Sequence, residues 1–317
     1  MKSKGSVGKW ISGPVFLLAL FLFPSPPAAG GPVRLGLLPV VDTLPLLAAE
    51  EQGLFEEQGL EVELIYFQSA MERDVALQAG RLDGCFGDLL NTLLLAGAGA
   101  EVRIVATAFR TNSDHRMFGV VGAPGSGIRT YRDLEGKRVA ISRATIIEYL
   151  LDRLLEREGL EEGFVVKEEI KKIPVRLQVL LADRVSAALL PEPLLTLAEQ
   201  QGGRVVLDDR GLDTTLTVVA LTNELLQRGG NAGPAFVRAY RRAVRRINRN
   251  PEAYRDLLVR RTRFPEQVGE AYRVPLFPDA RVPPIKDLEE VGGWMSSRGL
   301  VDKLPSYREM VWQGEVR

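Results

Sequence analysis

Short apolar runs alternate with helical patterns along the first part of the chain after residue 30. The apolar runs, which are typical of buried β-strands, cover residues 33–38, 62–67, 82–86 and 102–107. The segments between them have the apolar spacing of amphipathic helices and cover residues 44–58, 71–79 and 88–95. Strands alternating with helices predict βαβ units, and therefore a mostly parallel sheet flanked by helices.

The same pattern starts again near Gly119. Further strands are predicted at 120–121, 137–141, near 165, at 187–190 and, after a polar loop, at 215–221. Helices are predicted at 145–158, 177–182 and 194–201, and the last third is helical, with segments opening at Pro234, Pro251 and Ile285. Two α/β units in 317 residues agree with the usual length of about 100–200 residues for one domain.

The first 30 residues have the composition of a signal peptide. Lys2, Lys4 and Lys9 precede an apolar run at 15–23, and the small residues 28–30 follow a proline-rich stretch. The apolar run is shorter than the ~20 residues that a membrane span needs. We therefore predict export to the periplasm or the extracytoplasmic face with cleavage near Gly30, and a retained anchor is the alternative.

Cysteine and charge exclude several classes of protein. Cys85 is the only cysteine, so no intramolecular disulfide can form, and no cysteine follows the signal segment as a lipoprotein would require. The 41 basic residues equal the 41 acidic residues, which argues against nucleic-acid binding. The arginines at 238–249 alternate with apolar residues at helical spacing, which predicts a solvated helix face.

The sequence offers no catalytic or cofactor-binding motif. His115 is the only histidine, so neither a histidine–cysteine metal cluster nor a histidine-based triad is expected. The glycine-rich stretch at 122–127 lacks the spacing of a phosphate-binding loop and is interpreted as a turn. We expect no enzyme activity, no metal and no cofactor.

Four sequence stretches together resemble a known family. They are PVVDTLPLLAAEEQGLFEEQGLEVELI at 39–65, ALQAGRLDGCFGD at 76–88, YRDLEGKRVAIS at 131–142 and LLADRVSAALLPEP at 180–193. In this order they resemble the periplasmic substrate-binding proteins of ABC transporters, in the branch that handles nitrate, sulfonates, taurine and thiamine-pyrimidine precursors. The resemblance covers almost the whole chain after the signal segment.

The resemblance implies an α/β, two-lobed periplasmic-binding-protein-like fold of type II, with a ligand cleft between the lobes. Residues 31–114 and 216–317 would form lobe 1, and residues 115–215 would form an inserted lobe 2, with crossings near 110–119 and 209–217. It also implies a small-molecule ligand, delivery to an ABC transporter permease and a monomeric receptor. Ligand would shift such a receptor from open to closed forms.

Ligands of open α/β sheets bind beyond the carboxyl ends of the strands, and this rule selects the candidate ligand-binding residues. In the first unit these are Pro39, Val40, Asp42, Gln68, Ser69, Ala70, Gly87, Asp88 and Thr107. In the second unit they are Ser142, Arg143, Ala144, Thr145, Pro191 and Glu192.

Two ligand chemistries remain open on these residues. Ser69 and residues 142–145 precede helices, where backbone N–H groups favour an anion, although they also suit N-caps. Asp42, Asp88 and Glu192 would instead accept hydrogen bonds from an amine or an amino-heterocycle, and Asp88 can equally cap its helix. We slightly prefer a heterocycle, such as a pyrimidine thiamine precursor, and interpret the aromatic residues 67, 86 and 149 as core.

Two other classes of function compete with transport. One is an enzyme on the same fold, as in the menaquinone pathway, but such enzymes lack export signals. The fungal thiamine-pyrimidine synthases resemble this fold too, yet their cysteine-rich, histidine-bearing iron motif is absent here. The other is a ligand-sensing subunit of a membrane receptor, which genome neighbours would distinguish from a transport protein.

Overall fold

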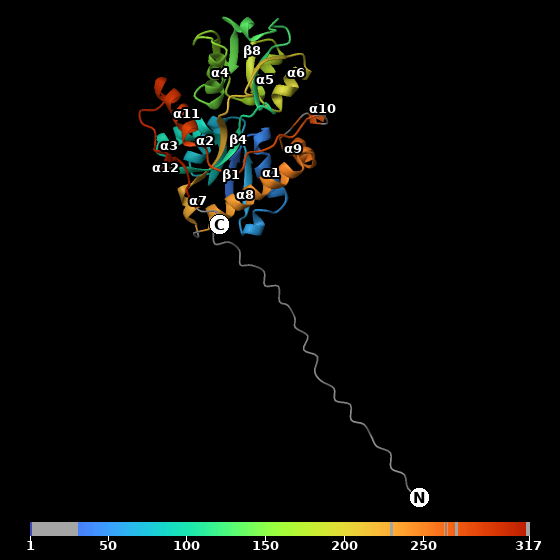
Figure 1. The fold of residues 1–317 in the computed structure, drawn as a ribbon, viewed down its shortest axis with the longest axis vertical. Coiled ribbons are helices and arrows are strands. Elements are labelled where there is room, and N and C mark those ends of the chain that lie inside the picture. The colour runs from blue at the N-terminus through green and yellow to red at the C-terminus, as the bar shows by residue number, and fades with distance from the viewer. Residues whose placement is uncertain (2–30, 229–230, 263, 265, 270–271, 315–317) are drawn as a thin grey trace.

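The computed structural model describes residues 1, 31–228, 231–262, 264, 266–269 and 272–314. Residues 2–30, which carry the predicted signal peptide, lie outside the described residues. Two five-stranded sheets with flanking helices form two stacked parts of the molecule (Figure 1). Among the described helices, none is both long enough and apolar enough to cross a membrane.

The first sheet has the strand order β2-β1-β3-β10-β4. Its strands are Val33–Leu37 (β1), Val62–Tyr66 (β2), Gly84–Asp88 (β3), Val102–Arg110 (β4) and Thr215–Thr222 (β10). The helices packed with this sheet are Leu44–Glu51 (α1), Ala70–Gln78 (α2), Leu89–Gly97 (α3), Asn223–Gln227 (α7), Ala232–Arg249 (α8), Arg255–Thr262 (α9), Glu266–Gly269 (α10), Ile285–Ser297 (α11) and Tyr307–Met310 (α12). We call this sheet and these helices lobe 1.

The second sheet has the order β7-β6-β8-β5-β9. Its strands are Phe118–Gly122 (β5), Arg138–Ile141 (β6), Val166–Glu169 (β7), Ala187–Pro191 (β8) and Arg204–Asp208 (β9). Its helices are Ile146–Arg157 (α4), Ile173–Leu181 (α5) and Leu194–Gln200 (α6). We call this sheet and these helices lobe 2; it is the green and yellow part of Figure 1.

The two-lobed α/β fold class is confirmed, and each mostly parallel sheet contains one antiparallel strand. Strand β1 runs parallel to β2 and β3, while β10 runs antiparallel to β3 and β4. In lobe 2, β6 runs parallel to β7 and β8, while β5 runs antiparallel to β8 and β9. The antiparallel strand in each sheet is the one that the chain enters directly from the other lobe.

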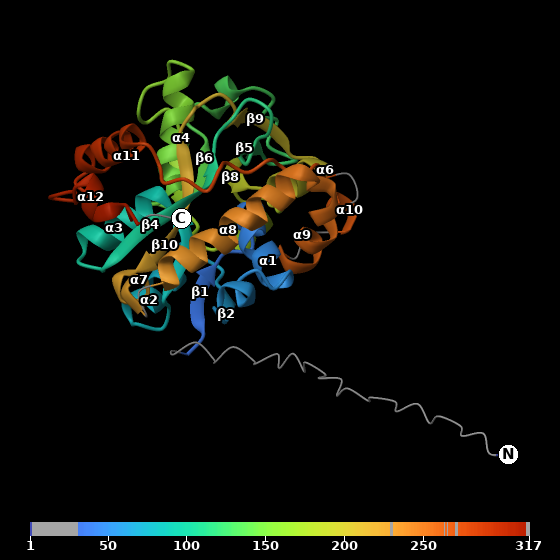
Figure 2. The ribbon, with the colours of Figure 1, turned by 60° about the horizontal axis from the view of Figure 1, so that its bottom comes forward.

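The chain crosses between the sheets twice, from β4 to β5 through residues 111–117 and from β9 to β10 through residues 209–214. In Figure 2 the C-terminal helices α11 and α12 lie beside α3 of lobe 1, close to α4 of lobe 2. The assignment of residues 31–114, 115–215 and 216–317 to the lobes stays a prediction at the level of individual boundary residues.

Two local predictions differ from the structure. The helix predicted at 44–58 ends at Glu51, because Gly53 adopts a left-handed conformation (φ 63°) and a short 3-10 turn, Glu56–Gln58, follows. The loop predicted before β10 contains the edge strand β9, whose apolar centre is short and bounded by Arg204 and Asp208. A charged boundary of this kind is common on edge strands and hides the strand pattern.

The basic segment predicted to be a solvated helix face is α8. Its apolar side, which includes Phe236 and Tyr240, is buried in the lobe 1 core. Arg238 donates to Gln58 and Arg246 donates to Gln52, both on the chain between α1 and β2. The arginines therefore attach α8 to the first βαβ unit.

Candidate functional site

A cavity lies between the two lobes, at the carboxyl ends of strands from both sheets. The cavity has a volume of about 50 Å³, which leaves room for a small polar group. Its lining residues from lobe 1 are Leu38, Val40, Asp42, Ala70, Phe86, Asp88 and Thr217. Its lining residues from lobe 2 are Phe118, Ser142, Thr145, Ile146, Ile147, Lys171, Ile173, Arg176 and Pro191.

Seven predicted ligand-binding residues therefore meet at one cavity. They are Val40, Asp42, Ala70, Asp88, Ser142, Thr145 and Pro191. They come from five separate segments between residues 40 and 191, and they converge because parallel strands of each sheet end at the same edge. The structure brings them together; contact with a ligand stays a prediction.

Asp42 is the most unusual acid of the cavity. It lies in a 3-10 turn after β1 and is 1% exposed. Its Oδ2 accepts a hydrogen bond of 2.6 Å from the Thr217 hydroxyl of β10, whereas its Oδ1 has no hydrogen-bond partner among the described residues. Burial raises the pKa of Asp42 to about 6, although the bond from Thr217 acts in the opposite direction.

Asp88 ends β3 and is the N-cap of α3. Its carboxylate accepts a bond of 2.6 Å from the Asn91 backbone N–H, so the predicted capping role is confirmed. Burial raises the pKa of Asp88 to about 7, and the nearby Arg73 guanidinium and backbone N–H groups offset only part of this effect. Asp88 thus combines a cap with a position on the cavity wall.

The opposite wall is the start of α4 in lobe 2. Thr145 is its N-cap: the hydroxyl accepts from the Ile147 N–H at 3.2 Å and donates to the Ser142 carbonyl at 2.8 Å. Ala144, just before the cap, has a φ of 52°, which places this turn in the left-handed region. The N-terminus of a 12-residue helix therefore faces the cavity and contributes a partial positive charge.

Arg176 is a lining residue that the sequence analysis missed. Its side chain is 1% exposed, and its guanidinium donates to the backbone carbonyls of Ile170 (2.9 and 3.1 Å) and Leu189 (3.2 Å). Burial lowers the pKa of Arg176 to about 10, so the group is still cationic at neutral pH. The sequence did contain one indication of a special role, because Arg176 is the only charged residue of the otherwise largely apolar helix α5.

Thr217, Lys171 and the apolar lining residues other than Val40, Ala70 and Pro191 were also missed. Thr217 belongs to β10, an antiparallel strand, so the rule about parallel strand ends does not select it. Phe86 was interpreted as core, and it is both buried at 2% exposure and part of the lining. Lys171 is exposed at the rim, where its Nζ lies 3.4 Å from the Met71 sulfur across the cleft.

Eight predicted residues lie outside the lining. They are Pro39, Gln68, Ser69, Gly87, Thr107, Arg143, Ala144 and Glu192. Ser69 caps α2 through the Glu72 N–H, and Gly87 packs under the Arg73 guanidinium. Thr107 donates its backbone N–H to the Arg281 carbonyl, so it is part of the lobe 1 framework.

Glu192 has structural partners that the sequence did not reveal. It is 1% exposed and accepts from the Arg116 guanidinium at 3.1 Å and from the Thr196 N–H and hydroxyl at 3.1 and 2.9 Å. Burial raises the pKa of Glu192, while Arg116 acts against this rise. Its carboxylate therefore ties the first crossing to α6, and the preference for a heterocycle loses one of its two supports.

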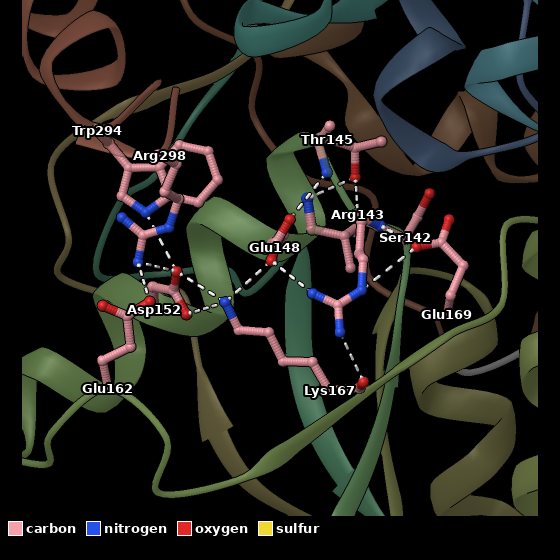
Figure 3. A network of polar contacts seen from close by, with 12 residues as sticks. Ser142, Arg143, Thr145, Glu148, Asp152, Glu162, Lys167, Glu169, Trp294 and Arg298 are labelled. Atoms are coloured by element: carbon pink, nitrogen blue, oxygen red, sulfur yellow. Dashed lines mark hydrogen bonds and ion pairs between the residues drawn. The ribbon is translucent and has the colours of Figure 1, made fainter. Parts of the chain in front are cut away.

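Arg143 does not line the cavity, and its side chain belongs to a network of polar contacts along α4 (Figure 3). It lies 3.5 Å from Glu148 and 3.7 Å from Glu169. One turn further along α4, Asp152 accepts from Lys167, from Arg298 at 2.8 Å and from the indole N–H of Trp294 at 3.2 Å. Because residues 294 and 298 belong to lobe 1, Asp152 connects the two lobes.

Other contacts cross the mouth of the cleft. The Ile173 N–H donates to the Gln68 carbonyl at 3.4 Å, and Lys172 pairs with Glu72 at 3.2 Å. The Val41 N–H donates to the Glu192 carbonyl at 3.4 Å. The lobes are therefore in contact on several sides of the cavity, as in a closed cleft.

Comparison with known proteins agrees with this architecture. The family model described as NMT1/THI5 like matches residues 41–254. The alkanesulfonate-binding protein SsuA of Xanthomonas axonopodis pv. citri, solved with MOPS, has a similar structure, with a TM-score of 0.74 and 20% identity over 87% of this chain and 96% of that chain.

Two curated relatives match shorter stretches. An aliphatic sulfonates-binding protein of Bacillus subtilis is 29% identical over 32% of this chain and 31% of its own length. The 4-amino-5-hydroxymethyl-2-methylpyrimidine phosphate synthase of Schizosaccharomyces pombe is 25% identical over 30% of this chain and 27% of its own length. The chain thus spans less than a third of these two relatives. Because the family match covers most of the sequence and includes both lobes, the chain belongs to the NMT1/THI5-like family.

Proposed function

We propose that the protein is an extracytoplasmic solute-binding protein that captures a small molecule between its lobes and delivers it to an ABC transporter permease. The observation that carries this proposal is a cavity that is lined by residues at the strand ends of both lobes. A ligand there would contact both lobes at once and favour the closed arrangement. The signal-like N-terminus supports export, and the sulfonate-binding relatives support transport.

The lobe 2 side of the cavity favours a ligand with an anionic group over an uncharged heterocycle, while the carboxyl groups of Asp42 and Asp88 line the lobe 1 side. Arg176 and Lys171 supply two positive charges, and the N-terminus of α4 adds a partial one. The name of the Bacillus relative points the same way. The match to a pyrimidine phosphate synthase supports the heterocycle, but it covers only 30% of this chain.

The proposal is tested by a thermal-shift screen of residues 31–317 after unfolding and refolding to remove bound ligand. The panel contains sulfonates, nitrate, carboxylates, amino acids, pyrimidines and flavins. Ligand at 100 times its dissociation constant adds about 2.7 kcal/mol of stability, which raises the melting temperature by roughly 5 °C in a protein of this size. One chemical class should produce this shift.

A blocked cavity provides the decisive variant. Ala70 lies in the first turn of α2 and lines the cavity, so Ala70→Phe fills space that the ligand needs. Val75 lies on the same helix, is 59% exposed and does not line the cavity, so Val75→Phe is the matched control. The shift should disappear in A70F and persist in V75F. A shift unchanged in A70F would place the ligand elsewhere, and no shift in the folded wild type would refute the proposal.

A further inference from the structure

The two lobes place a buried arginine at the same position. Arg73 is the fourth residue of α2 and Arg176 is the fourth residue of α5. Each donates through Nη1 to the carbonyl of the third residue of the following strand, Phe86 in β3 at 2.9 Å and Leu189 in β8 at 3.2 Å. The lobes therefore share one framework, and a difference between these sites is informative.

The difference is the next residue. Asp74 follows Arg73 and accepts from its guanidinium at 2.6 and 2.9 Å, whereas Leu177 follows Arg176. Burial alone would lower the pKa of Arg73, but Asp74 and other negative groups raise it; burial lowers the pKa of Arg176, and the charge of Glu169 offsets only part of this effect. Among the described residues, no carboxylate lies within ion-pair distance of Arg176.

Arg176 also has donors to spare. A guanidinium carries five N–H bonds, and the three hydrogen bonds to Ile170 and Leu189 leave two for another acceptor. A buried cation is costly unless it is paired, and two N–H bonds of one guanidinium match the two oxygens of a carboxylate or a sulfonate. Arg176 lines the cavity, so the cavity is the place from which such an oxyanion can reach it.

The lobe 1 wall of the cavity contains a buried acceptor that lacks a hydrogen-bond donor. The Oδ1 atom of Asp42 is buried without a hydrogen-bond partner in the described part of the chain, and Asp42 lines the same cavity. A carboxylate oxygen can be satisfied only by a donor. The buried Tyr240 hydroxyl also lacks a described partner, so a water between Tyr240 and Asp42 is the competing explanation.

We infer that Arg176 and Asp42 determine the specificity of the cavity, and that its ligand is a short bipolar molecule with an oxyanion at one end and an ammonium or N–H donor at the other. Arg176 of lobe 2 binds the oxyanion and Asp42 of lobe 1 accepts from the donor. Such a ligand satisfies one buried group in each lobe and therefore links them. The inference rests on the proposed function, because it assumes that the cavity is the ligand site.

The test compares matched pairs of probes by calorimetric titration of the refolded, ligand-free chain. The pairs are ethanesulfonate with 2-aminoethanesulfonate, and propionate with 3-aminopropionate. In at least one pair the amino compound should bind about tenfold tighter, because it adds a charge-assisted hydrogen bond to Asp42. Equal or weaker binding of the amino member in both pairs would overturn the inference.

Three variants assign the effect to residues. Asp42→Asn keeps the shape and the bond with Thr217, so it should remove the tenfold preference while the unsubstituted anion still binds. Arg176→Lys keeps the charge but loses the paired N–H bonds, and it should weaken both members of a pair about equally, by tenfold or more. Glu192 lies outside the cavity lining, so Glu192→Gln should preserve the tighter binding of the amino compound.

These outcomes separate the inference from the proposed function. A preference that survives in D42N would show that Asp42 serves Tyr240 through water, and it would overturn the inference while ligand binding stands. Undiminished binding in R176K by a folded variant, confirmed by its melting curve, would also overturn the inference. If other compounds of the thermal-shift panel bind and neither pair does, the inference alone fails; if nothing binds, both fail.

Discussion

Replacing Asp42 by asparagine should stabilise the ligand-free protein at neutral and alkaline pH. Burial raises the pKa of Asp42 from its ordinary 3.8 to about 6, so folding favours the protonated carboxyl. The folded form thus holds one more proton than the unfolded form between about pH 4 and pH 6, and stability falls as pH rises through this window. Above pH 6 the loss is complete and amounts to about 3 kcal/mol, which corresponds to the rise of the pKa from 3.8 to about 6.

The side-chain amide that D42N introduces carries no charge, and its oxygen can still accept from Thr217, so the variant should lack this loss. We expect D42N and wild type to have similar free energies of unfolding near pH 4, and D42N to be more stable by up to about 3 kcal/mol at pH 8. The assay is urea unfolding followed by tryptophan fluorescence at pH 4, 5, 6, 7 and 8.

Asp83 provides a control of opposite sign in the same lobe. Burial acts to raise its pKa, but hydrogen bonds from Arg34 and the charge of Arg228 lower it below the ordinary value. Asp83→Asn should therefore destabilise the protein at pH 7, and the destabilisation should shrink as the pH falls. If D42N is less stable than wild type at pH 8, or if the difference between them does not depend on pH, the claim that the buried charge of Asp42 destabilises the ligand-free protein is refuted.

Two further substitutions test contacts outside the cavity. Asp152→Asn weakens the ion pairs of α4 with Lys167 and Arg298 and leaves the cavity lining unchanged. We expect ligand affinity, measured by calorimetric titration, to fall roughly fivefold, which is about 1 kcal/mol. An unchanged affinity would show that this link does not favour closure. Glu192→Ala leaves Arg116 without its most buried partner and should lower the free energy of unfolding by roughly 2 kcal/mol in urea, and a stability equal to wild type would contradict the role assigned to this pair.

The sequence predicted the parts of the fold and site that depend on local pattern. Asp42, Asp88, Ser142 and Pro191 lie at or just beyond the carboxyl ends of strands. Their selection followed from apolar periodicity and from the rule on carboxyl ends, and the structure brings them to one cavity. The N-caps of α2, α3 and α4 followed from residue type.

The parts that failed depend on partners distant in sequence. Arg176 reaches the cavity from inside a helix, which no periodicity predicts, and Glu192 meets Arg116 across 76 residues. Strand β10 returns from lobe 2 to run antiparallel beside β3, so the contribution of Thr217 and the direction of β10 required the tertiary structure. Local pattern specifies elements, while long side chains and strand order depend on how the elements pack.

The central claim, capture of a solute between two lobes, is tested most directly by the distance between the lobes. Cys85 is buried at 1% exposure, so spin labels will react with introduced cysteines. Suitable positions are Val75 on α2 of lobe 1 and Val175 on α5 of lobe 2, which are both exposed. Each lies three residues after one partner of the Glu72–Lys172 contact between the lobes, and the labels are attached through Val75→Cys and Val175→Cys. We predict that a compound active in the thermal-shift screen changes the electron–electron distance distribution from a broad one to a single shorter distance. A distribution unchanged at saturating ligand would contradict the account.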